Sequence, residues 1–459
     1  MTDHSSDIVA SIVGSATGAK RYRPYPAYKD SGVEWLGKIP ATWEVKENRW
    51  LFRESDARSE CGEEELLTVS HISGVTRRAD KPDVTMMEAA SHEGYKLCGR
   101  GDLAINTMWA WMGALGVACE DGMVSPSYNV YCTNFSELVP SYYDYLCRVP
   151  THIVEITRHS KGIWSSRLRL YPDTFRNIRT PVPPKSEQRR ITEFLDRTTV
   201  KIDRLIAKKE RLIELLKEKR TAFITRAVTK GLNPDEPMKD AEVDWLGEIP
   251  AHWETIRLKQ VADKIGSGKT PAGGAHRYVA DGVMLVRSQN VHFGGLELTD
   301  VAYIDAATDA KMSNSRVCEE DVLLNITGAS LGRCCVARLA GMNANVNQHV
   351  CIIRTDQRQC YAAFFAYSLE SHMLQDQIFN SENGISRDAL NFELVGTLVF
   401  VKPPLNEQRS IAIFLEHATE EIDTLISNVR SAIDHLREFR IALVSAAVTG
   451  KIDLREAVP

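Results

Sequence analysis

The sequence predicts an α+β fold in which two domains of mixed α/β structure alternate with two long helices, as an internal repeat with pseudo-twofold symmetry. Three observations predict it. Two segments of the 459-residue chain each occur twice, the second of them has the composition of a long helix, and the stretches between them are mostly unlike. An internal repeat of this kind indicates that the chain contains two copies of one structural unit.

The first repeated segment precedes each variable stretch. Residues 28–45 read YKDSGVEWLGKIPATWEV and residues 238–255 read MKDAEVDWLGEIPAHWET, with 11 of 18 positions identical at an offset of 210. Each copy combines apolar residues with a Gly-x-Ile-Pro turn. We therefore expect substitution of Trp35 or Trp245 to damage folding.

The second repeated segment predicts a long helix. PPKSEQRRITEFL begins at Pro183 and PPLNEQRSIAIFL at Pro403, and 21 of 50 positions match from there onward. Glycine and proline are absent from 185–230 and from 405–449. Ser186 or Asn406 supplies an N-cap, and a glutamate follows in the first turn of each helix.

Apolar residues recur along both helices at alternating steps of four and three, from Ile191 to Phe223 and from Ile411 to Leu443. This spacing is typical of a coiled coil. Because one chain carries two matching helices, we expect them to pair antiparallel. At about 1.5 Å per residue the first copy forms a rod of roughly 50 Å. The alternative is an amphipathic helix that packs on the core of a domain.

The variable stretches, 46–180 and 256–400, alternate short β-like runs with glycine-rich turns. They share a few anchor residues. These are Leu67 and Ser70 with Leu285 and Ser288, Asp102 and Asn106 with Asp321 and Asn325, the glycines of 113–116 with those of 328–332, and Arg167 with Arg387. One scaffold that carries different surface residues suits two different recognition surfaces.

Composition limits the class of protein. No run reaches the roughly 18 apolar residues of a membrane span, and the first 20 residues lack the features of a signal peptide, so we expect a loose leader. The ten cysteines include no C-x-x-C pair. A reducing cytoplasm is therefore the expected location.

Taken in order, the motifs resemble those of the specificity subunit (S, HsdS) of type I restriction–modification systems. The resemblance rests on the duplicated W-L-G-x-I-P-x-x-W segments, the P-P-x-x-E-Q-R helix starts and the A-V-T helix ends. GSGKTP at 266–271 and NVNQHV at 345–350 are also similar to parts of that family. The likeness extends from about residue 25 to residue 455.

The resemblance implies a division into a leader (1–25), a first target-recognition domain (26–182), a first conserved helix (183–232), a second target-recognition domain (233–402) and a second conserved helix with its tail (403–459). It implies a non-catalytic subunit that reads a bipartite target in double-stranded DNA, one half with each domain. The implied partners are two modification (methyltransferase) subunits, for adenine methylation, and restriction (motor–nuclease) subunits, with no membrane. No cofactor is expected on this chain, because the methyl donor, ATP and Mg belong to the partners.

Searches for a catalytic motif in the sequence fail. GSGKT lacks the first glycine of a phosphate-binding loop because Asp263 stands at that position. No His, Asp or Glu cluster has metal-ligand spacing, so no metal is expected. Two alternatives remain open: a stand-alone DNA-modifying enzyme with diverged motifs, and a coiled-coil scaffold protein without DNA contact.

Candidate DNA-binding residues follow from side-chain chemistry, since Arg pairs with guanine and Asn or Gln with adenine. In the first domain they are Ser70, His71, Arg77, Arg78, Trp109, Trp111, Tyr128, Arg158, Lys161 and Arg167. In the second they are Lys264, Ser267, Lys269, Thr270, Arg287, Gln289, Asn290, His292, Asn345, Asn347, Gln348 and Arg387. The pairs Asn106/Asn325 and Arg167/Arg387 occur in both domains, which favours scaffold or phosphate contacts over discrimination between bases.

Charge differs between the two conserved helices. Residues 183–232 carry 14 Lys and Arg against 7 Asp and Glu, whereas residues 403–452 carry 5 against 7. The basic helix faces either DNA phosphate or an acidic partner, and we favour the partner. The net charge of the whole chain, −5, suggests that partner subunits supply much of the attraction to DNA.

Overall fold

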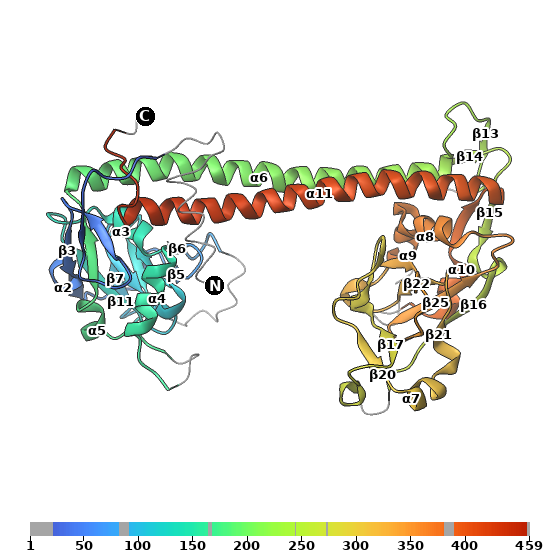
Figure 1. Cartoon of the computed structure of the whole chain (residues 1–459), viewed down its shortest axis with the longest axis horizontal. Helices are drawn as coiled ribbons and strands as arrows, with labels where there is room; N and C mark the ends of the chain where they lie inside the picture. Colours follow the sequence, from blue (N-terminus) through green and yellow to red (C-terminus); the bar gives the residue numbers. More distant parts are fainter. Residues whose placement is uncertain are drawn as a thin grey trace. The chain divides into compact units, whose positions relative to one another are not determined.

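The computed structural model describes residues 22–81, 91–163, 168–243, 245–271, 274–380 and 390–456. The chain divides into two compact units, 1–209 with 430–459, and 210–429. Two long helices, α6 (Lys185–Lys230) and α11 (Leu405–Val448), each contribute residues to both units (Figure 1).

The first unit is built on a four-stranded antiparallel sheet of order β4-β11-β8-β9. Hairpin β5–β6 and the pairs β7–β10 and β3–β12 surround it. The strands are β1 (Tyr28–Asp30), β2 (Lys38–Pro40), β3 (Glu44–Glu47), β4 (Phe52–Ser55), β5 (Leu67–Ser70), β6 (Gly74–Arg77), β7 (Lys96–Cys98), β8 (Leu103–Ile105), β9 (Leu115–Val117), β10 (Gly122–Val124), β11 (Asn129–Thr133) and β12 (Arg179–Val182). The short helices are α2 (Asn48–Leu51), η1 (Ala110–Met112), α3 (Pro140–Leu146), α4 (Pro150–His159) and α5 (Pro172–Arg176).

The second unit repeats this sheet as β16-β25-β22-β23 and adds a second sheet, β20-β17-β24-β21, in which β17 and β24 are parallel. The strands are β13 (Met238–Asp240), β14 (Glu248–Pro250), β15 (Glu254–Arg257), β16 (Ala262–Ser267), β17 (Val283–Val286), β18 (Val291–His292), β19 (Gly295–Leu296), β20 (Ala302–Ile304), β21 (Arg316–Val317), β22 (Val322–Asn325), β23 (Cys334–Val336), β24 (Ala344–Val346), β25 (Val350–Thr355) and β26 (Val399–Lys402). The helices are η3 (Leu258–Gln260), η4 (Gly274–Arg277), η5 (Ser288–Asn290), α7 (Ala306–Lys311), η6 (Ser313–Ser315), η7 (Gly328–Ser330), α8 (Ala362–Glu370), α9 (His372–Asn380) and α10 (Phe392–Thr397).

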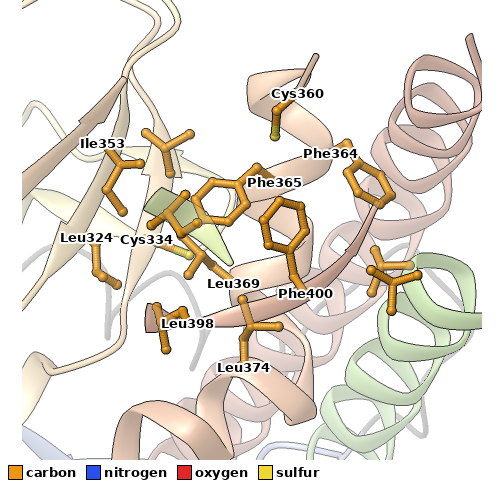
Figure 2. Close-up of a cluster of buried hydrophobic side chains, with 14 of the residues drawn as sticks. Leu324, Cys334, Ile353, Cys360, Phe364, Phe365, Leu369, Leu374, Leu398 and Phe400 are labelled. Atoms are coloured by element: carbon orange, nitrogen blue, oxygen red, sulfur yellow. The ribbon is translucent and has the colours of Figure 1, made fainter. Parts of the chain in front are cut away.

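The core of the second unit lies between the repeated sheet and helices α8 and α9. Phe364, Phe365 and Phe400 are buried there with Leu324 and Ile353 of the sheet (Figure 2). Apolar burial is the main stabilising contribution to such a core.

Within each unit the two long helices run antiparallel, and one ion pair occurs twice. Arg440 Nε lies 2.9 Å from Asp203 Oδ1 in the first unit. Arg220 Nε lies 3.2 Å from Asp423 Oδ1 in the second. The predicted fold class, two mixed domains with an antiparallel pair of long helices, is confirmed.

The period of the buried helix face differs from the heptad spacing that the sequence suggested. On α6 the buried residues include Ile191, Ile202, Ile213 and Ile224, and on α11 they include Ile411, Ile422, Ile433 and Val444. Each series advances by 11 residues. Eleven residues fill three helical turns at 3.67 residues per turn, so the pair needs no left-handed supercoil to keep these residues in contact.

Residues that the heptad spacing placed in the interface consequently lie outside it. Leu205, Leu212, Phe223 and Leu425 are exposed, whereas the neighbouring Ile206, Ile213, Ile224 and Ile426 are buried. The heptad spacing and the 11-residue spacing select the same residues at the start of each helix and different residues after about three turns. At these four positions the predicted register is therefore wrong by one residue.

The two repeated segments contact each other in both units. The Glu187 carboxylate accepts hydrogen bonds from Trp43 Nε1, at 3.0 Å, and from the Tyr25 hydroxyl. In the second unit the Glu407 carboxylate accepts from Trp253 Nε1 at 2.9 Å and contacts His252 Nε2 at 2.8 Å. The glutamate of P-P-x-x-E-Q-R thus binds the second tryptophan of W-L-G-x-I-P-x-x-W.

The glutamine of the same motif binds main chain. Gln188 Oε1 accepts from the Val139 amide at 2.7 Å, and its Nε2 donates to the carbonyls of Glu137 and Pro183, both at 2.9 Å. Gln408 makes the same three bonds to residues 361, 359 and 403. This side chain fixes the start of each long helix to its domain.

Two expectations about the first repeated segment need correction. Trp43 and Trp253 are the buried tryptophans, whereas Trp245 is 47% exposed and Trp35 is half-buried. The expected folding defect stays a prediction, and the exposure of Trp245 makes a smaller defect the expected result there. Tyr25, which the sequence division left in the leader, is buried against Glu187 and Trp43.

Candidate nucleic-acid interface

The two domains match residue by residue around the turn that follows β8 and β22. The Asn106 amide donates to Ala114 O at 3.0 Å, and the Asn325 amide to Arg333 O at 2.8 Å. The loops between them have equal length and end at Gly113 and Gly332, which share a left-handed backbone, with φ of 92° and 82°. Gly113 therefore corresponds to Gly332, and not to Gly328 as the sequence alignment had it. Trp109 takes the position of Gly328.

The two shared asparagines are scaffold residues. Asn106 Nδ2 donates to the Tyr128 hydroxyl at 3.2 Å, and Asn325 Nδ2 to Ser288 O at 2.8 Å. Both side chains are buried, and each ties the end of a central strand to a neighbouring segment.

Three candidate base readers are buried and have structural bonds. Asn290 Nδ2 donates to the carbonyls of Glu297 and Asp300, and Asn345 bonds to Ser315 and Asp309. Burial also raises the pKa of Tyr128. These three side chains are buried and hydrogen-bonded within their domain, which disfavours direct contact with bases.

Several charged candidates are held in ion pairs. Arg77 Nε donates to Glu120 at 2.6 Å, and Arg158 Nη1 to Glu34 at 2.9 Å. Arg287 Nη2 lies 3.4 Å from Asp300. Arg77 and Arg158 are exposed, so DNA phosphate would compete with a surface pair of modest strength. The remaining candidate of this kind, Arg78, is half-buried, with its amide bonded to Leu66 O.

Four further candidates of the first unit, His71, Trp109, Trp111 and Ser70, lie on or beside two neighbouring loops. The rings of His71 and Trp109 stack with centroids 6.3 Å apart. Trp111 Nε1 donates to Met108 O at 3.1 Å, and Ser70 Oγ accepts from the Ile72 amide at the same distance. Lys161 is exposed and exchanges main-chain hydrogen bonds with Arg169.

In the second unit a chain of polar contacts joins three segments. The Thr270 hydroxyl bonds to Gln348 Oε1, Gln348 Nε2 lies 2.8 Å from His349 Nε2, and His349 Nδ1 lies 2.5 Å from Thr327 Oγ1. This chain fixes the orientation of the exposed Gln348 amide. His349 and Thr327 were missed by the sequence reasoning, although His349 stands within the NVNQHV motif.

The other candidates of the second unit are placed as follows. Three side chains donate hydrogen bonds: Lys264 Nζ to Asn314 O, Ser267 Oγ to Gly268 O, and Gln289 Nε2 to Asp300. His292 Nε2 contacts Gln289 O, and Asn347 Oδ1 accepts a hydrogen bond from the His349 amide. Lys269 is exposed. Arg167 and Arg387 lie outside the described residues.

A cavity of about 680 Å³ lies in the second unit, between the helix pair and the β18–β19 hairpin. Arg220, which bonds to Glu370 and Asp423, lines it. None of the candidate base readers does. In the part of the chain that the structure describes, no three His, Cys, Asp or Glu side chains are placed to hold a metal ion. No helix among those residues is both long and apolar enough to cross a membrane.

Comparison with known proteins gives a consistent set of relatives. The type I restriction enzyme EcoBI specificity subunit of Escherichia coli is 24% identical over 286 residues, which are 61% of this chain and 59% of the relative. The type I restriction enzyme MjaVIII specificity subunit of Methanocaldococcus jannaschii is 24% identical over 284 residues, 61% of this chain and 64% of the relative. The chain thus spans about three fifths of the length of these curated relatives.

A solved structure shares the fold. It was determined in work on complex assembly and conformational transition of the type I R-M system, and it superposes with a TM-score of 0.66 at 17% identity, covering 89% of this chain and 98% of that one. No family model matches the chain. The resemblance that the motifs suggested is confirmed by the relatives.

Proposed function

We propose that this chain is the DNA sequence-recognition subunit of a type I restriction–modification complex and that it reads a bipartite, asymmetric target. The observation that carries the proposal is one strand scaffold present twice, with different exposed residues at equivalent positions. Trp109 stands where the second unit has Gly328, although the flanking asparagines and glycines are the same. Unlike surfaces on one scaffold read unlike half-sites.

The helix pair offers equivalent positions for two partner subunits. Leu205 and Leu425 occupy the same position in the two copies and are 43% and 51% exposed. Exposed leucines outside the helix–helix interface suit docking of another protein, since their burial is favourable. We assign one methyltransferase subunit to each position and assign the restriction subunits to the same complex. The methyl donor, ATP and Mg would then be held by these partners, in the cytoplasm.

The experiment is a reconstitution with the cognate modification subunits. We expect the complex to shift duplex DNA in a sequence-dependent manner and to transfer a labelled methyl group to adenine, and we expect the chain alone to transfer none. Transfer by the chain alone would instead favour a stand-alone enzyme. A complex that forms but never binds DNA would favour a scaffold protein.

A further inference from the structure

The first unit exposes apolar side chains at the place where base readers were expected. Ile72 is 78% exposed at the turn of the β5–β6 hairpin, and Met108 and Trp109 are 39% and 49% exposed on the loop after β8. The His71–Trp109 stack joins the two loops. We call Ile72, Met108 and Trp109, with His71, the apolar tip.

Hydrogen bonds from neighbouring segments hold the loops of the apolar tip in place. Trp109 O accepts hydrogen bonds from the amides of Met112 and Ala114, and Thr157 Oγ1 donates to Trp111 O at 2.9 Å. Arg148 donates to Gly113 O and Leu115 O, at 3.3 and 2.6 Å. Its guanidinium lies so close to Gly74 that a side chain there would collide with it. Arg148 therefore positions both loops, and the tip needs little ordering when it binds.

A segment that carries two cationic residues lies beside the Trp109 loop. The Leu170 amide donates to Thr107 O at 3.1 Å, which places the neighbouring Arg169 next to the Trp109 loop. Arg169 and Lys161 are joined by two main-chain hydrogen bonds, of 2.9 and 3.0 Å, and both are exposed. An exposed aromatic ring flanked by Lys and Arg suits a polyanion that has stackable bases.

The described residues of the second unit carry no aliphatic or aromatic side chain at the positions equivalent to those of the tip. Gly328 takes the position of Trp109. When Ser288 is aligned with Ser70, the buried Asn290 stands at the position of Ile72. The exposed polar groups there include the amides of Gln289 and Gln348. The two units thus present different chemistry on the same scaffold.

We propose that the apolar tip is a wedge that enters duplex DNA within the half-site read by the first unit. Trp109 stacks on a base at a step that Ile72 opens, while Lys161 and Arg169 contact the flanking phosphates. Insertion of apolar side chains between base pairs reads how easily a step unstacks, in addition to its hydrogen-bonding groups. The second unit reads its half-site by hydrogen bonds. This inference rests on the proposed function.

The test uses the assembled modification complex and duplexes of the mapped target with 2-aminopurine at successive purine positions, the methylated adenines excepted. We expect fluorescence to rise at one step of the first half-site with the wild-type chain and to stay low with Trp109→Gly or Ile72→Asn. Trp109→Gly should bind about 5- to 150-fold more weakly, the range for loss of one base–aromatic stack, and Ile72→Asn should also bind more weakly than the wild type. Trp50→Gly, at a 67% exposed tryptophan on α2, is the control and should bind as the wild type does.

Other outcomes distinguish the competing accounts. Variants that bind and fluoresce like the wild type would overturn the wedge. So would variants that lose affinity for the methyltransferase subunits and keep that for DNA, since the tip would then dock protein. A wild-type complex that does not bind the target duplex would overturn the proposed function itself. Both changed residues are exposed, and an unchanged thermal unfolding temperature checks that the variants fold.

Discussion

At the scale of single residues, the structure explains why two short motifs recur. Glu187 and Gln188 act on different groups: the carboxylate binds a tryptophan and a tyrosine, and the amide binds three main-chain groups. The same pair recurs as Glu407 and Gln408. The motifs are repeated because each unit needs the same junction between helix and domain.

We predict that Gln188→Ala destabilises the first unit by about 3 kcal/mol. The change leaves the Val139 amide and two carbonyls without their partner in a buried position, and each unpaired group costs roughly 1–3 kcal/mol. Thermal unfolding measures the effect. Gln408→Ala should destabilise the second unit equally, and Arg189→Ala, at an exposed neighbour, should change little.

His152 predicts a pH dependence that belongs to the first unit alone. Its ring is fully buried 5.3 Å from that of Trp35, neither nitrogen has a hydrogen-bond partner among the described residues, and desolvation lowers its pKa to about 4. The folded state therefore binds fewer protons than the unfolded state. Stability is complete above the ordinary pKa of 6.5 and is lost as the pH falls toward 4.

The second unit has Leu374 at the position equivalent to His152, so leucine is a suitable replacement for this histidine. His152→Leu should remove the loss of stability between pH 6.5 and 4, a difference of roughly 3 kcal/mol at the acid end. Leu374→His should introduce the same loss in the second unit. Unfolding curves at pH 5 and pH 7 measure both, and equal acid sensitivity of wild type and His152→Leu would contradict the assignment.

At the scale of elements, the sequence predicted the long helices and their pairing but not their period. Both helices lack glycine and proline and begin after Pro-Pro, so their existence could be predicted from local signals. Leu205 and Ile206 are both apolar, and the choice between them depends on the partner helix, which a sequence pattern does not contain. The buried series Ile191, Ile202, Ile213 and Ile224 decides it.

The period of 11 determines which insertions the helix pair tolerates. Duplicating residues 203–213 and 423–433 adds three whole turns to each helix, about 16 Å at 1.5 Å per residue. We expect the buried face to stay in register, the half-site sequences to stay unchanged, and the spacer between them to lengthen. Methylation mapping reads the result, and altered bases inside the half-sites would contradict it.

An insertion of four residues in each helix is the matched control. Four residues exceed one turn of this period by roughly 30–40° in rotation, so the added turn moves the interface residues out of register. We expect a lower unfolding temperature for this variant than for the variant with 11 added residues, although its helices are shorter.

The candidate interface was predicted only in part. Lys, Arg and aromatic residues in loops mark nucleic-acid surfaces by composition, and His71, Trp109, Thr270 and Gln348 do lie exposed. Asn290 and Asn345 have the same side chain as a base reader but are buried, because an asparagine amide is equally suited to hydrogen bonds within the protein. Residue type therefore suggested the chemistry, and burial decided the role.

At the scale of the whole molecule, duplication predicts the number of docked subunits. Leu205→Asp should remove one of two equivalent docking positions and Leu425→Asp the other, because a carboxylate cannot be buried at low cost. We expect each single variant to bind one methyltransferase subunit and the double variant none, as measured by analytical ultracentrifugation. If the double variant still binds two methyltransferase subunits, these subunits dock elsewhere on the chain.

The central claim is that one scaffold presents two different readers. The measurement that tests it most directly is sequencing of methylated adenines in cells that carry the chain with its partner subunits. The account predicts two half-sites of different sequence, separated by a spacer of fixed length and unrestricted sequence. A single continuous site, or two identical half-sites, would contradict it.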